Sequence, residues 1–235
     1  TGPAKPDPTR FTPVTVIEPG ELDEPMAFEV LPGGKVYVIE RKGVLKVYDP
    51  ATKRTRAVET LPVNIKYWGA DGTAREGEEG LIGLTLDPKF AENHFIYLLY
   101  ADTQVTKHVL ARWTINEFDE LDPDSKQVIL EWGTQREICC HTGGGMAWDA
   151  AGNLLITVGD NTGVNLTAHT DERAGRQNWD DQHTAANTND LRGKILQSGV
   201  LEALEGGGES VYDAIEKWRS AGGTLAVDTM TLAWG

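Results

Sequence analysis

The chain has 235 residues, of which 40% are hydrophobic and 25% charged, a composition that is ordinary for a globular protein and excludes wholesale disorder. Lys and Arg total 22 against 36 Asp and Glu, so the net charge is −14, which disfavours binding to nucleic acid or to anionic membrane surfaces. No apolar run approaches the roughly 20 residues that cross a bilayer, so we expect neither a nucleic-acid partner nor membrane insertion.

Short β-rich segments and turn residues alternate along most of the chain. Residues 1–10 contain three prolines and are predicted to be a linker. A β-rich segment at 11–18 begins the folded part, and the spacing of the following segments is typical of antiparallel hairpins. Two polar stretches, 66–79 and 162–190, separate the hairpins, and the second is long enough to be a functional loop.

One hairpin pattern occurs three times, at 28–39, 84–99 and 146–158. Each copy has an apolar strand, a turn with Gly or Asp-Pro, and a second apolar strand. The intervals exceed the roughly 40–50 residues of a four-stranded propeller blade, so we interpret each copy as a blade with insertions. The sequence therefore predicts an all-β fold, with β-propeller blades over residues 11–195.

The pattern changes after Ile195. Residues 210–220 have helical spacing and are followed by two glycines, and residues 224–227 are typical of a strand. A helix followed by a strand is foreign to a propeller, so residues 196–235 are predicted to be a short α/β tail outside it.

The densest chemical signal is the segment Cys139-Cys140-His141-Thr142 and the three glycines that follow it, just before the third hairpin. A histidine can accept a hydroxyl proton near neutral pH, and glycines let the backbone approach a flat ligand or adopt positive φ. The simpler alternative is a histidine bonded within its own loop. The adjacent cysteines form either a vicinal disulfide or two reduced, half-buried thiols, and both alternatives stay open.

Oxygen-rich residues after the third hairpin provide candidates for binding a hard cation such as Ca²⁺, with Asp160 as the candidate ligand. For Asp180 and Asp181, and for 187–190, side-chain-capped turns are the simpler interpretation.

Three ordered motifs resemble the glucose/sorbosone dehydrogenase family. They are residues 78–90 (Glu-Glu-Gly-Leu-Ile-Gly-Leu-Thr-Leu-Asp-Pro-Lys-Phe), His141 to Gly144 with 152–160, and 191–195 (Leu-Arg-Gly-Lys-Ile). The resemblance implies a six-bladed propeller with pyrroloquinoline quinone over its central channel and Ca²⁺ nearby. It also implies an oxidoreductase of the periplasm or outside the cell, which oxidises a small sugar by hydride transfer to the quinone.

The resemblance also assigns roles to individual residues. His141 is expected to be the general base, and Gly143 and Gly144 to shape the cofactor face. Glu78 and Asn165 fall where family members have glutamines that contact cofactor or substrate. The carboxylate of Glu78 is a departure from that pattern, because it would face an anionic cofactor.

The resemblance covers only about three blades, and the family's later arginine segment and calcium loop have no counterpart in this sequence. We therefore expect a partial propeller that self-associates through open blade edges and binds the quinone weakly. Two alternatives are a carbohydrate-binding or interaction propeller without catalysis, and a metal-dependent propeller lactonase.

Overall fold

The computed structural model describes residues 7–69, 71–163, 172–176 and 179–198. Within these ranges the helices are a 3-10 turn, η1 (Pro8–Arg10), and the single-turn α1 (Phe90–Asn93). Neither is long and apolar enough to span a membrane. The helix predicted at 210–220, the strand predicted at 224–227 and Asn165 lie outside the described residues.

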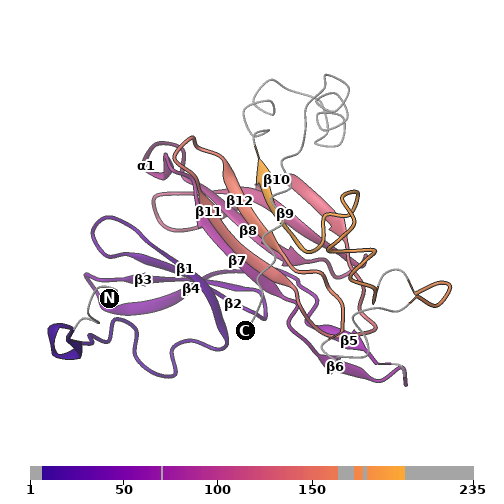
Figure 1. Ribbon diagram of the computed structural model, residues 1–235. Helices are drawn as coiled ribbons and strands as arrows, with labels where there is room; N and C mark the ends of the chain where they lie inside the picture. The colour runs from indigo at the N-terminus through magenta and orange to yellow at the C-terminus, as the bar shows by residue number, and fades with distance from the viewer. Residues whose placement is uncertain (1–6, 70, 164–171, 177–178, 199–235) are drawn as a thin grey trace.

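Three antiparallel meanders dominate the structure (Figure 1). The first sheet contains β1 (Pro25–Val30), β2 (Val36–Glu40), β3 (Val44–Asp49) and β4 (Arg54–Thr60). The second contains β7 (Leu81–Leu86), β8 (Phe95–Ala101), β9 (Lys107–Ile115) and β10 (Leu121–Gly133). The third contains β11 (Gly143–Trp148), β12 (Leu154–Val158) and β13 (Lys194–Ser198).

The three sheets lie side by side in chain order, and their first strands are next to one another. β7 contacts β1 on one side and β11 on the other, so the first strands of consecutive sheets are neighbours. One buried apolar cluster, which includes Ile39, Leu84 and Ile96, joins the first two sheets. Another, which includes Ile82, Leu99 and Ile156, joins the second and third. This is the arrangement of propeller blades, and it confirms the predicted all-β, propeller-type fold.

The three predicted hairpins are confirmed as β1–β2, β7–β8 and β11–β12. The prediction of a β-rich segment at 11–18 is wrong, because these residues form no strand. Pro13 lacks the N–H that a ladder needs, and Val14 is 78% exposed with no neighbouring strand to pair with in the described part of the chain.

Two further details differ from the sequence analysis. The polar stretch 66–79 contains a small hairpin of β5 (Lys66–Trp68) and β6 (Ala74–Glu76). β13 continues to Ser198, three residues beyond the predicted domain boundary at 195. The side-chain-capped turns expected at Asp180 and at 187–190 are confirmed, since the Asp180 carboxylate accepts a hydrogen bond from the N–H of Gln182, and the Asn187 side-chain oxygen accepts one from the N–H of Asn189. The Asp181 carboxylate instead accepts a hydrogen bond from the Thr162 hydroxyl.

Candidate active site

The loops that precede β7 and β11 and the ends of β1 and β2 surround a hollow of about 550 Å³. These segments meet because the first strands of the three sheets are neighbours. The hollow is lined by Glu24, Met26, Arg41, Glu76, Gly77, Glu78, Thr142 and Gly143. Two of the residues singled out from the sequence, Glu78 and Gly143, therefore lie in one cavity.

The guanidinium of Arg41 is the cation among these lining residues, and it is engaged by neighbouring groups. Its Nη2 donates to both oxygens of Glu24, at 3.1 and 3.0 Å, and to Glu76 at 2.7 Å. Its Nη1 donates to the carbonyl of Gly77 at 2.9 Å. The hydrogen bond from Arg41 holds the pKa of Glu24 below its ordinary value. The hollow thus has three glutamates and one arginine, and it is acidic overall.

Sequence reasoning missed Arg41. The available signal was its position, since it follows β2 directly and lies at the strand end where the other loops gather. Its partners Glu24 and Glu76 are far from it in sequence, and no local pattern indicates that they share one site.

Glu78 lies against the loop that carries the candidate base. Its Oε2 is 3.4 Å from the N–H nitrogen of Thr142 and 3.5 Å from the Thr142 hydroxyl, so the carboxylate accepts two long hydrogen bonds from the residue after His141. The motif before β7 and the motif before β11 are thereby brought together.

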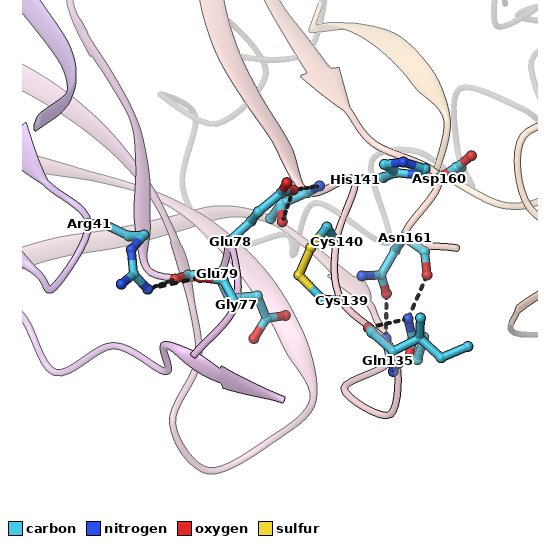
Figure 2. Close-up of a disulfide and its surroundings, with 12 residues drawn as sticks. Arg41, Gly77, Glu78, Glu79, Gln135, Cys139, Cys140, His141, Asp160 and Asn161 are labelled. Atoms are coloured by element: carbon cyan, nitrogen blue, oxygen red, sulfur yellow. Dashed lines mark hydrogen bonds and ion pairs between the residues drawn. A yellow bond between two sulfur atoms is a disulfide. The ribbon is translucent and has the colours of Figure 1, made fainter. Parts of the chain in front are cut away.

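His141 is not among the residues that line the hollow, although the two residues that follow it, Thr142 and Gly143, are. Its Nδ1 is 2.9 Å from Oδ1 of Asp160, and Figure 2 shows the imidazole beside that carboxylate. The His141 side chain is 38% exposed and that of Asp160 is 21% exposed. Within the described part of the chain, Nε2 of His141 has no hydrogen-bond partner. The pair therefore resembles a base that is oriented by a carboxylate.

Asp160 also accepts a hydrogen bond from the N–H of Thr162 at 3.1 Å. The residues that the structure describes contain no group of three or more His, Cys, Asp or Glu side chains placed to hold a metal ion. A metal-binding role for Asp160 remains a prediction, and its observed contacts are with the histidine and its own turn.

The glycines after His141 have a structural requirement of their own. Gly144 has φ +119°, and a Cβ there would lie 2.6 Å from the carbonyl oxygen of Ile82 in β7. Gly143 has φ +79°, and its Cβ would lie 2.7 Å from the carbonyl oxygen of Thr157. Close packing of β11 against its two neighbours explains both residues, so their role toward a cofactor stays a prediction.

Glu79 is buried beside the hollow and is fully engaged. Its carboxylate contacts Nε2 of His108 at 3.1 Å, Nε of Arg136 at 2.5 Å and Nδ2 of Asn64 at 2.6 Å. Burial alone would raise the pKa of Glu79, but the hydrogen bonds and charges of His108 and Arg136 outweigh it and hold the pKa below its ordinary value. This cluster fixes the backbone next to Glu78, and nothing in the Glu78-Glu79 doublet predicts which of the two is buried.

The model of the glucose/sorbosone dehydrogenase family matches residues 22–197. The chain belongs to this family. An uncharacterized protein of Synechocystis sp. is 28% identical over 141 residues, which are 59% of this chain and 33% of that protein.

Solved structures are similar in fold. The PQQ-bound form of an aldose sugar dehydrogenase from Streptomyces coelicolor aligns with a TM-score of 0.53 and 21% identity, covering 75% of this chain and 44% of that one. The apo-form of the soluble aldose sugar dehydrogenase of Escherichia coli aligns with a TM-score of 0.52 and 21% identity, with the same two coverages. The chain thus spans a third of the curated relative and less than half of these solved chains.

Membership of the family implies a quinone cofactor, PQQ, like the one bound in the Streptomyces coelicolor protein. The residues that line the hollow of this chain do not suit that cofactor. The quinone is an anionic, carboxylate-bearing molecule, whereas the hollow presents Glu24, Glu76 and Glu78. Arg41 is already paired with two of these glutamates, and the Thr142 N–H faces the third. The described part of the site would repel the cofactor's carboxylates, so no chemical step through the quinone is assigned to it.

Proposed function

We propose that this chain supplies the proton-abstracting part of a sugar dehydrogenase, with His141 as the general base and Asp160 as the residue that positions it. Membership of the glucose/sorbosone dehydrogenase family supports the reaction class. The observation that carries the assignment is the 2.9 Å contact between Nδ1 of His141 and Oδ1 of Asp160.

The contact with Asp160 supports a separate role for each imidazole nitrogen. When Nδ1 carries the proton it donates to Asp160, and the lone pair of Nε2 is then free to accept the proton of a sugar hydroxyl. The imidazolium that forms is stabilised by the Asp160 carboxylate, which keeps its own charge. Oxidation also needs a two-electron acceptor, which the described residues do not provide. Proton transfer is therefore the step assigned to this chain.

The test is sugar-dependent reduction of a redox dye at saturating quinone and Ca²⁺. We expect weak turnover of aldoses by the unaltered chain, and a loss of about 10²–10⁴-fold in His141→Ala because general-base catalysis contributes that much. Asp160→Asn should lower kcat with little change in KM, since Asp160 touches the base and not the substrate. His183→Ala, which removes an exposed histidine, is the matched control.

Turnover that survives in His141→Ala, or the absence of sugar-dependent reduction by the unaltered chain, would overturn the proposal. Glycan binding without turnover would favour the non-catalytic alternative, and Ca²⁺-dependent ester hydrolysis would favour the lactonase.

Weak quinone binding is part of the proposal. The acidic hollow supports it. In an absorbance titration we expect no stoichiometric uptake of quinone by the 235-residue chain, with or without Ca²⁺. Stoichiometric uptake would show that the glutamates do not exclude the cofactor.

We also propose self-association through a second copy. Alternate side chains of β1 are exposed, Met26 at 43%, Phe28 at 67% and Val30 at 57%, although β1 is the first strand of a blade. A contiguous apolar stripe on a strand of this kind favours burial against another sheet. In sedimentation velocity at rising concentration we expect a dimer or larger species, which Phe28→Lys should dissociate. A monomer at all concentrations would contradict this.

An exported location, in the periplasm or outside the cell, completes the proposal. It is supported by the disulfide between Cys139 and Cys140, because disulfides persist mainly in oxidising compartments. Fractionation of the native host, with a protease-accessibility control, would test it.

A further inference from the structure

The vicinal disulfide lies between the two loops that build the site (Figure 2). The sequence left the state of these cysteines open, and in the structure they are bonded to each other. The pair sits one residue before His141. On its other side it faces the loop before β7, where a Cβ on Gly77 would lie 3.5 Å from Sγ of Cys139.

Packing around the disulfide is close. Cys139, Cys140, Tyr67, Glu78 and Thr142 are among the residues around a gap of only about 10 Å³, too small to hold more than one water molecule. Because this gap is so small, movement of the sulfur atoms would displace the loop of Glu78 as well as the loop of His141.

The backbone before the disulfide is fixed by the buried carboxamide of Gln135. Its Oε1 accepts hydrogen bonds from the N–H groups of Glu137 and Ile138, both at 2.8 Å. Its Nε2 donates to the carbonyls of Ile138 at 2.9 Å and Asn161 at 2.7 Å. These hydrogen bonds therefore fix the backbone as far as Ile138, the residue before Cys139.

The backbone after the disulfide is in an unfavourable conformation. His141 has φ +57°, in the left-handed region that residues with a side chain rarely adopt. Opposing this, the carbonyl of His141 accepts a hydrogen bond from the N–H of Asn161 at 3.2 Å, and that of Thr142 accepts one from Gly159 at 3.3 Å. Both hydrogen bonds are long. The covalent ring of Cys139 and Cys140 is therefore the stiffest link between His141 and the segment that Gln135 holds in place.

We propose that the Cys139–Cys140 disulfide is a redox-sensitive positioning element, which holds His141 against Asp160 when closed and releases it when reduced. This inference rests on the proposed role of His141. A dithiol reductant would break the Sγ–Sγ bond by thiol–disulfide exchange. Each cysteine sulfur ends as a protonated thiol, and the two thiols of the reductant end as its own disulfide. Both cysteines are half-buried, so a small dithiol can reach them.

The test compares the oxidised and dithiol-reduced protein in one sample by ¹⁵N–¹H spectra of its histidine rings, with His141→Gln used to assign the signal. In the oxidised protein we expect one imidazole tautomer at His141, with the proton on Nδ1 facing Asp160. In the reduced protein we expect averaging between the two tautomers, reversed on reoxidation. His94 is the internal control, because it also has φ +57° and lies far from the disulfide in sequence. Its signals should not change.

The double variant C139S/C140S removes the disulfide without a reductant, and it tests the proposal even if reduction unfolds the loop. It should resemble the reduced protein at His141, retain the circular dichroism of the fold and no longer respond to the dithiol. Where sugar turnover is measurable, reduction should lower kcat about tenfold or more and leave KM nearly unchanged, since small misplacements of a base are costly.

The outcomes separate the two proposals. An unchanged His141 signal on reduction overturns the positioning role, whatever the turnover. Loss of tautomer selection at His141 with His94 unchanged supports it. Absence of sugar turnover in every form counts against the proposed function alone.

Discussion

Glu78 and Glu79 are consecutive residues in two contrasting regions of the molecule. Glu79 is buried, with a side chain 9% exposed; its carboxylate forms an ion pair with Arg136 and contacts Nε2 of His108. Glu78 lines the open hollow and receives two long hydrogen bonds from Thr142. The two carboxylates before β7 therefore differ in role: that of Glu79 fixes the loop between two blades, and that of Glu78 lies on the open hollow.

Removing the buried charge should have the largest effect. Glu79→Gln leaves the guanidinium of Arg136, whose side chain is 8% exposed, without its carboxylate, and breaking a buried ion pair costs about 3–5 kcal/mol. We expect the free energy of unfolding in urea to fall by that amount. A loss no greater than that of Glu78→Gln would erase the distinction between the two glutamates.

The packed region extends to the contact between β11 and β7, which Gly144→Ala should break. A Cβ at this residue meets the Ile82 carbonyl, and the positive φ adds strain, so a loss of about 1–3 kcal/mol in unfolding free energy is expected. Gly133→Ala is the matched control, because nothing lies within 4 Å of its Cβ and its φ is not positive. Equal stability of the two variants would contradict this account of Gly144.

Acid should reduce the contribution of Glu79 to the free energy of unfolding. The pKa of Glu79 is held below its ordinary value in the folded state, so its contribution is complete above the unfolded pKa of about 4.3 and is lost as the pH falls through the lower folded pKa. The stability difference between the unaltered chain and Glu79→Gln should therefore shrink below about pH 4. Urea midpoints measured from about pH 2.5 to about pH 6 check this, and a stability difference that grows in acid would contradict the predicted sign.

The smallest effect on stability is expected in the hollow. Glu78→Gln should change the unfolding free energy by less than about 0.5 kcal/mol, as is usual for positions outside the packed core. It should nevertheless tighten quinone binding, because one repelling charge is removed. Glu59→Gln, at an exposed position on β4, removes the same charge elsewhere and should leave quinone binding unchanged.

Much of the fold follows from local sequence. Apolar segments separated by turn residues predict the hairpins β1–β2, β7–β8 and β11–β12, because a turn fixes the register of the strands next to it. The same reasoning fails at 11–18, where β-rich residues have no partner strand. A strand needs hydrogen bonds from a neighbour, and a neighbour is not a local property.

For the site, the residue types alone indicate the available chemistry: a histidine after two cysteines, a glycine run and a glutamate doublet before a strand. How these residues are used depends on the way the chain folds. The tertiary structure places Asp160 at 2.9 Å from His141, sets Arg41 between Glu24 and Glu76, and buries Glu79 while leaving Glu78 in the hollow. Each of these contacts joins different loops, and such contacts are set by how the blades pack, which no local spacing encodes.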